Sequence, residues 1–149
     1  MNDALRDLYR EVILDHSRRP RNFGAMDAAN RQSDGFNPLC GDRLRLFLLV
    51  EDGAVRQASF VGDGCAISTA SASLLTEAAR GLPEEEVLRL VENFRGMVSG
   101  EGEPDGESLG KLTVFAGVRD YPTRVKCATL AWHTLRAAIE QTGETVKTE

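Results

Sequence analysis

Two adjacent β-prone runs constrain the fold of this chain more than any other feature. Residues 43–51 and 55–61 are rich in leucine, valine and phenylalanine, and Asp52-Gly53 lies between them. Asp-Gly readily adopts the left-handed conformations of a tight turn, so the two runs are predicted to form a β-hairpin. An earlier strand over residues 31–36 is only weakly signalled.

Helical patterns surround this hairpin. Apolar residues recur every three or four positions in four segments, which predicts amphipathic helices. The first ends near Arg19-Pro20, the second runs from Gly64 to Gly81, a short one begins at Pro83, and a long one begins near Val125. The expected buried stripes are Leu5, Leu8, Tyr9, Val12 and Ile13; Ile67, Ala70, Leu74 and Ala78; Val87, Leu90, Val91 and Phe94; and Cys127, Ala131, Leu135 and Ala138.

The chain is predicted to be one domain, residues 1–149. At this length, with 42% hydrophobic residues, it can bury a core without a metal. A glycine- and glutamate-rich stretch at about 98–110 predicts an exposed acidic loop. The net charge of -5 argues against general binding to nucleic acid or an anionic membrane. No apolar run reaches the roughly 18 residues of a membrane span, so we expect a cytoplasmic protein.

Three cysteines are the candidate functional residues. Cys40 lies in the triplet Cys40-Gly41-Asp42, while Cys65 and Cys127 lie at the starts of predicted helices. An odd number of cysteines cannot all pair in disulfides, and a helix start favours the thiolate form. Together with Asp42 they supply the four ligands of a tetrahedral zinc site. The alternative is that each cysteine is a small buried apolar residue and that Asp42 is an ordinary turn residue.

Four further residues are weighed as possible members of the metal site. Arg124 and Lys126 precede Cys127 and would lower the pKa of a neighbouring thiol, although two solvated charges at a helix start explain them nearly as well. His133 is predicted to lie away from the face of Cys127, at the surface or the edge of the core. His16, at the end of the first helix, is predicted to have a structural role.

In this order, the motifs resemble the IscU/NifU N-terminal family of iron–sulfur cluster assembly proteins, and within it the SufU subgroup. The resemblance is carried by Tyr9–His16, Pro20–Gly24, Asn37–Asp42, Gly62–Ser73 and Lys126–Ala128. It implies an α+β fold in which helices pack mainly on one side of a small antiparallel three-stranded sheet, with a metal site at one end.

The resemblance also implies a function, that of a zinc-dependent sulfurtransferase. Asp42, Cys65 and Cys127 would anchor Zn²⁺, and Cys40 would be the metal ligand that can leave. Cys40 would then take persulfide sulfur from a SufS-like cysteine desulfurase and pass it to downstream iron–sulfur assembly components. Arg124 is a candidate for an electrostatic contact in the docked complex.

Two other functions stay open on the sequence. An IscU-type scaffold would assemble a [2Fe–2S] cluster on Cys40, Cys65 and Cys127, and thiolates suit iron as well as zinc. Lys126 stands where scaffold members of the family carry a histidine, and this departure favours zinc. An adaptor would hold a purely structural zinc and merely bind its partner, although structural sites more often use Cys-x-x-Cys pairs.

Overall fold

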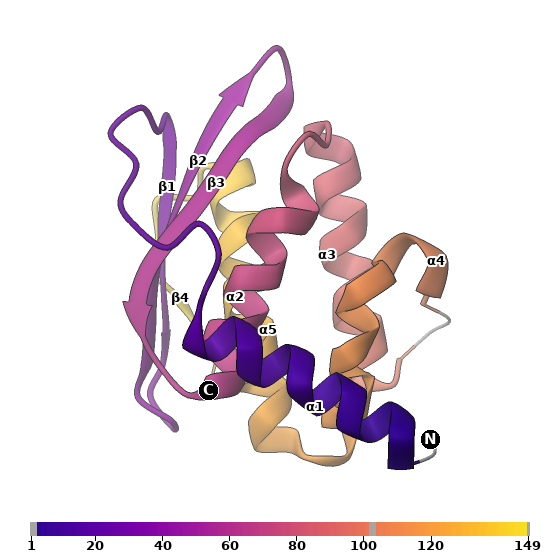
Figure 1. Cartoon of the computed structure of the whole chain (residues 1–149). Coiled ribbons are helices and arrows are strands. Elements are labelled where there is room, and N and C mark those ends of the chain that lie inside the picture. The colour runs from indigo at the N-terminus through magenta and orange to yellow at the C-terminus, as the bar shows by residue number, and fades with distance from the viewer. Residues whose placement is uncertain (1–2, 102–103, 149) are drawn as a thin grey trace.

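The structure, a computed structural model, describes residues 3–101 and 104–148. These residues form a mixed sheet with helices packed on one of its faces (Figure 1). The strands are β1 (Arg31–Asn37), β2 (Asp42–Glu51), β3 (Ala54–Asp63) and β4 (Val146–Lys147), in the order β3-β2-β1-β4. The helices are α1 (Asp3–Arg18), α2 (Ala66–Ala79), α3 (Glu84–Ser99), α4 (Gly106–Leu109) and α5 (Pro122–Glu140), with a 3₁₀ segment, η1 (Gly110–Asp120), before α5.

The predicted hairpin and α+β class are confirmed. Strands β2 and β3 pair antiparallel around Asp52 and Gly53, whose φ angles of 53° and 73° are both left-handed. Strand β1 pairs antiparallel with β2, which confirms the weakly signalled strand. The fourth strand, β4, was not predicted and pairs in parallel with β1, so the sheet is mixed rather than purely antiparallel. With two residues, β4 is too short to produce an alternating pattern.

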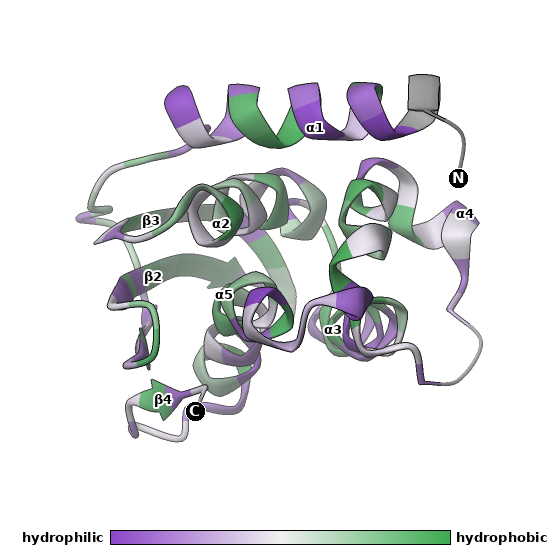
Figure 2. Ribbon diagram, turned by 90° about the horizontal axis from the view of Figure 1, so that it is seen from below, coloured by the Kyte–Doolittle hydropathy of each residue, from purple (hydrophilic) through white to green (hydrophobic). Residues whose placement is uncertain are grey.

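Helices α2 and α5 pack directly on the sheet, and the other helices cover them. Helix α1 lies on α2, and α3 lies on α5. Figure 2 shows these layers, with apolar residues prominent on β2 and β3 and hydrophilic residues prominent on α1. Helix α5 approaches β1 so closely that a Cβ at Gly35 would overlap Oγ1 of Thr134. This approach packs β1 against the middle of α5.

The helices agree with the predicted ones except in three respects. Leu8 is 53% exposed, so the buried stripe of α1 passes through Tyr9, Val12 and Ile13, and the side chain of Leu5 lies outside the described residues. Helix α3 is not short, since it has 16 residues. Helix α2 is buried on more than its predicted stripe, because it lies between the sheet, α1 and α5. Its many alanines and serines permit this close packing.

The segment at 98–110 contains more regular structure than a loop. Val98 and Ser99 continue α3, and the side chain of Asp105 accepts hydrogen bonds from the N–H groups of Glu107 and Ser108 at the start of α4. Residues 100–101 and 104–108 are exposed, and residues 102–103 lie outside the described residues. Within the described residues, no helix is both long enough and apolar enough to cross a membrane.

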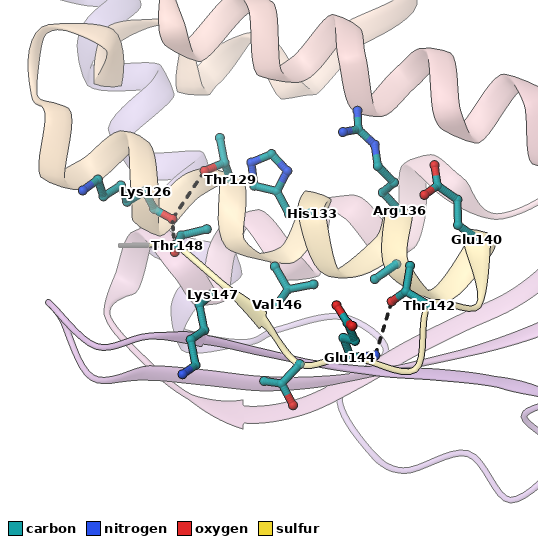
Figure 3. Close-up of a pocket in the computed structure, with 12 residues that line it drawn as sticks. Lys126, Thr129, His133, Arg136, Glu140, Thr142, Glu144, Val146, Lys147 and Thr148 are labelled. Atoms are coloured by element: carbon teal, nitrogen blue, oxygen red, sulfur yellow. Dashed lines mark hydrogen bonds between the residues drawn. The ribbon is translucent and has the colours of Figure 1, made fainter.

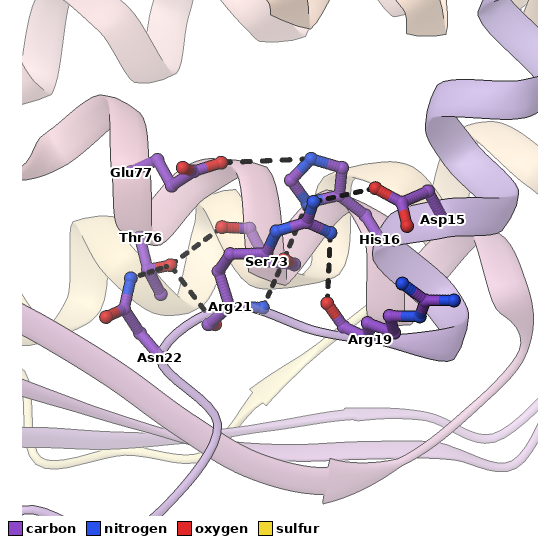
Figure 4. A network of polar contacts seen from close by, with 8 residues as sticks. All are labelled: Asp15, His16, Arg19, Arg21, Asn22, Ser73, Thr76 and Glu77. Carbon is purple, nitrogen blue, oxygen red and sulfur yellow. Dashed lines mark hydrogen bonds and ion pairs between the residues drawn. The ribbon is translucent and has the colours of Figure 1, made fainter.

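His16 connects α1 to α2 through a hydrogen bond, which agrees with the structural role predicted for it. Its side chain is almost fully buried, and Nδ1 lies 2.7 Å from Oγ of Ser73 (Figure 4). The same hydroxyl accepts the backbone N–H of Arg21 at 2.8 Å, which leaves its own proton for His16. The imidazole Nε2 then faces Glu77 at 3.8 Å. Burial, and next the Arg21 guanidinium, lower the pKa of His16.

Acidification is expected to destabilise the fold through His16. Because its pKa is lower in the folded state, the unfolded chain binds the proton first as the pH falls below about 6.5, and the free energy of unfolding decreases. Thermal unfolding at about pH 7.5 and about pH 5.5 should therefore show a smaller loss of stability in His16→Gln than in the unsubstituted protein. Burial, and next the Arg95 guanidinium, lower the pKa of His133 as well, so His133→Gln should also reduce the loss, and only the variant that lacks both histidines should lose both contributions. An unchanged pH dependence in His16→Gln would contradict this account.

Candidate metal centre

Cys40 lies in the tight loop that joins β1 to β2. Asn37, the last residue of β1, is paired with Asp42, the first residue of β2, so that residues 38–41 make the turn. Gly41 has a φ of 72°, a left-handed conformation that glycine adopts without strain. The side chain of Cys40 is exposed on this loop. Its thiol is therefore accessible from outside the molecule.

Asp42 is completely buried, with 0% of its surface exposed. Its Oδ1 accepts the backbone N–H of Cys65 at 2.8 Å, and its Oδ2 accepts Nδ2 of Asn37 at 3.3 Å. A Cβ at Gly64 would lie 2.8 Å from Oδ1, so glycine is required for this close approach. Among the described residues, no lysine, arginine or histidine forms an ion pair with this carboxylate. A buried carboxylate without a basic partner is suited to a bound cation.

Cys127 lies deeper than the sequence suggests. Helix α5 begins at Pro122 rather than near Val125, because proline is well suited to the first helical position, and Cys127 therefore lies in the second turn. Its side chain is 3% exposed, and its Sγ lies 3.2 Å from Sγ of Cys40. Burial, and next the hydrogen bond to Cys40, raise the pKa of the Cys127 thiol. The predicted helix-start stabilisation of its thiolate is therefore wrong for the protein without a bound cation.

Cys65 is the N-cap of α2, at the corner between strand and helix where the sequence places it. Its Sγ accepts the backbone N–H of Ser68 at 3.4 Å, and its own N–H is bound to Asp42. The ligand atoms of Cys40, Asp42 and Cys127 all lie within 4.8 Å of one another, and Cys65 is not in this group. Its thiol nevertheless contributes to the raised pKa of Cys127. The structure thus gathers three of the four predicted ligands and places the fourth beside them.

These donor groups fit a single metal ion. In a tetrahedral zinc site with Zn–S bonds of about 2.3 Å, neighbouring sulfur atoms lie about 3.8 Å apart. The Sγ atoms of Cys40 and Cys127 lie 3.2 Å apart, so they would have to separate slightly around an ion. A bound cation would also reverse the effect of burial, since it favours the thiolate form of its ligands. Thiolate and carboxylate donors suit zinc and iron alike, so the donor set alone does not distinguish the two metals.

The basic residues near Cys127 do not belong to the group of metal-ligating side chains. The Arg124 guanidinium lies over the ring of Tyr121, 4.7 Å from its centroid, and Arg124 is exposed. Lys126 and His133 line a groove between α5 and residues 142–148 (Figure 3). Among the described residues, the group of metal-ligating side chains contains neither histidine nor a further carboxylate. The partial burial of His133 agrees with its predicted place at the edge of the core.

Two residues of the centre were not assigned a role from the sequence. Asn37 contacts both buried ligands, with its Nδ2 3.6 Å from Sγ of Cys127 as well as 3.3 Å from Asp42. Gly64 makes room for the Asp42 carboxylate. Both belong to the motifs that carry the family resemblance. An asparagine or glycine beside a turn is ordinarily explained by the backbone conformation of the turn, so neither indicated a role at a metal site.

Comparison with known proteins identifies the family. Residues 8–128 match the NifU-like N terminal domain. The zinc-dependent sulfurtransferase SufU of Bacillus subtilis (strain 168) is 41% identical over 138 residues, which cover 93% of each chain. The iron-sulfur cluster assembly scaffold protein IscU of Streptococcus pyogenes serotype M1 is 40% identical over 139 residues, covering 93% of this chain and 87% of the relative.

A solved structure agrees with this assignment. The crystal structure of a protein from Fervidobacterium islandicum AW-1, described as an iron-sulfur cluster assembly scaffold for the SUF system, superposes with a TM-score of 0.83 at 36% identity. The similarity covers 87% of this chain and 94% of that one. The chain therefore belongs to the NifU-like N-terminal domain family, the family of the iron–sulfur cluster assembly proteins IscU and SufU.

Proposed function

We propose that this protein is a zinc-bound sulfur acceptor in iron–sulfur cluster assembly. It takes persulfide sulfur from a SufS-like cysteine desulfurase onto Cys40 and passes it to downstream assembly components. The observation that carries this proposal is the unequal exposure of neighbouring ligands. Cys40 is exposed on a glycine-containing loop, whereas Cys127 is 3% exposed and Asp42 is 0% exposed. The Cys40 thiol can therefore contact a partner protein while the Cys127 thiol and the Asp42 carboxylate stay buried.

The buried residues would hold the metal. Asp42, Cys65 and Cys127 are the proposed anchors, and Cys40 is the fourth ligand. When bound, Zn²⁺ would keep the thiols deprotonated without taking part in redox chemistry. The N–H of Cys65 and the amide of Asn37 already hold both oxygens of Asp42, so this carboxylate needs little rearrangement to act as a ligand.

The transfer step then belongs to Cys40. Its thiolate attacks the terminal sulfur of the desulfurase persulfide, and the sulfur–sulfur bond of the donor breaks. The desulfurase cysteine leaves as a thiolate, and a new sulfur–sulfur bond forms on Cys40. One sulfur atom moves between two thiolates, so the step needs neither an oxidant nor a reductant.

Arg124 is proposed as a docking contact for the desulfurase. Its guanidinium and the ring of Tyr121, which is 53% exposed, form a stacked pair just before the start of α5 and in its first turn. An exposed arginine held over an aromatic ring offers a partner both charge and apolar area. Arg124→Ala should lower sulfur transfer without changing metal content, and unchanged transfer would exclude this role.

The ligand group favours the acceptor over a cluster scaffold. Relatives named SufU and IscU are equally similar to this chain, so sequence identity does not choose between them. Lys126 occupies the position of the scaffold's histidine and lines the groove beside α5, and the described ligand group contains no imidazole. A purely structural zinc, in turn, would gain nothing from an exposed thiol.

Metal analysis of anaerobically purified protein tests this proposal. We expect colourless protein with about one zinc per chain, which accelerates a cysteine desulfurase when added to it. Asp42→Ala, which removes a buried ligand, should lose most of the metal and the acceleration. Brown protein with a stable cluster absorption, or zinc protein without effect on the desulfurase, would contradict the proposal.

A further inference from the structure

Asn37 connects three parts of the metal centre through one buried side chain. It is the last residue of β1 and is 0% exposed. Its Nδ2 donates to Oδ2 of Asp42 at 3.3 Å and to Sγ of Cys127 at 3.6 Å. Its Oδ1 accepts the backbone N–H of Leu39 at 3.2 Å, in the loop that carries Cys40. One amide thus joins β2, α5 and the Cys40 loop.

The orientation of this amide follows from its neighbours. The N–H of Leu39 requires an acceptor, so Oδ1 must face the loop, and the two N–H donors of Nδ2 are left for the carboxylate and the sulfur. Both donors of the amide are therefore used on proposed ligands that are buried. The two hydrogen bonds fix the position of the Cys127 sulfur relative to the Asp42 carboxylate.

We propose that Asn37 is a positioning residue that makes Cys127 an anchor and leaves Cys40 as the acceptor of sulfur. By holding Asp42 and Cys127 together independently of Cys40, it keeps the metal in place when Cys40 leaves. By donating to Sγ of Cys127 and not to Sγ of Cys40, it fixes the buried sulfur and leaves the exposed Cys40 free to move toward a partner. This inference rests on the proposed function for its sulfur step, while its effect on metal binding does not require sulfur transfer.

Two substitutions test the inference. Asn37→Ala removes the amide, and Asn37→Leu removes its hydrogen bonds while keeping nearly the same shape, which protects the fold. The matched control is Asn30→Ala at the opposite end of β1. The side chain of Asn30 makes two hydrogen bonds to the backbone of Val50, at 2.7 and 2.8 Å, far along the strand from the cysteines.

Two readouts separate positioning from simple destabilisation. The first is the affinity and thiolate charge-transfer absorption of the Co²⁺-loaded proteins, and the second is the cysteine that carries sulfur after incubation with a desulfurase. Both Asn37 variants should bind Co²⁺ about 10- to 100-fold more weakly, with altered absorption, and should carry sulfur on Cys127 as well as Cys40. Asn30→Ala should lose only thermal stability.

A failure of the inference can be distinguished from a failure of the proposed function. Unchanged Co²⁺ affinity and absorption in both Asn37 variants, with sulfur confined to Cys40, would overturn the inference. If the unsubstituted protein takes sulfur on no cysteine, the proposed function fails. The Co²⁺ measurements then still decide whether Asn37 positions the buried ligands.

Discussion

Replacing Cys40 by alanine is expected to lower sulfur acceptance by roughly 100-fold or more, because the attacking thiolate is removed. The proposed anchors Asp42, Cys65 and Cys127 remain, so we expect the variant to keep most of the metal that the unsubstituted protein binds. The measurement compares sulfur bound per chain and desulfurase turnover in Cys40→Ala with those of the unsubstituted protein, with metal content determined on the same samples.

Cys127→Ala is the matched control for this prediction. Cys127 is buried beside Cys40 with its Sγ 3.2 Å away, so its loss should release the metal rather than remove the acceptor. An adaptor with a structural zinc would tolerate Cys40→Ala. Full acceleration of the desulfurase by Cys40→Ala would therefore contradict the relay and favour the adaptor.

Trp132→Ala is expected to destabilise the fold by about 3–5 kcal/mol, a large part of the stability of a domain of this size. Trp132 is fully buried in α5 and stacks on Phe94 of α3 with ring centroids 4.4 Å apart. Its Nε1 donates to Oγ of Ser71 at 3.0 Å, and that hydroxyl donates to the carbonyl of Ala128 at 2.6 Å. The substitution removes both apolar area and a buried hydrogen bond, and chemical denaturation measures the loss.

Phe23→Ala provides the comparison for Trp132. Phe23 is 52% exposed and meets Phe60 edge to face at 5.2 Å, so its loss should cost about 1 kcal/mol. Because Trp132 joins α5 to α2, which begin near Cys127 and Cys65, its variant should also release zinc at a lower temperature. Equal stability of the two variants would show that the Trp132 contacts do not hold these helices together.

Local chemistry made much of the fold predictable. The Asp52-Gly53 turn specifies the β2–β3 hairpin with two residues, and the corner before α2 is signalled by the glycines that precede Cys65. The 3₁₀ segment η1 was not predicted, although its buried side chains close the core beside α3 and α5. Its turns are tighter than those of an α-helix and do not follow the spacing used to recognise one.

Three of the four residues predicted as ligands lie together in the candidate centre, but their arrangement could not be predicted. The triplet that contains Cys40 and Asp42 identifies a loop with two donors, since Gly41 permits the turn. The depth of Cys127 and its raised pKa depend on how α5 packs against β1, which no local pattern reports. The role proposed for Asn37 likewise depends on contacts between residues 90 positions apart.

Locating the transferred sulfur in zinc-loaded protein shows whether Cys40 is the acceptor. The protein is incubated with a cysteine desulfurase and its substrate, alkylated, digested and analysed by mass spectrometry, while zinc is measured in the same sample. We expect one additional sulfur atom on the peptide that contains Cys40, none on those with Cys65 or Cys127, and retained zinc. Sulfur on Cys65 or Cys127 in place of Cys40, or loss of zinc with assembly of an iron–sulfur cluster, would contradict the proposed function.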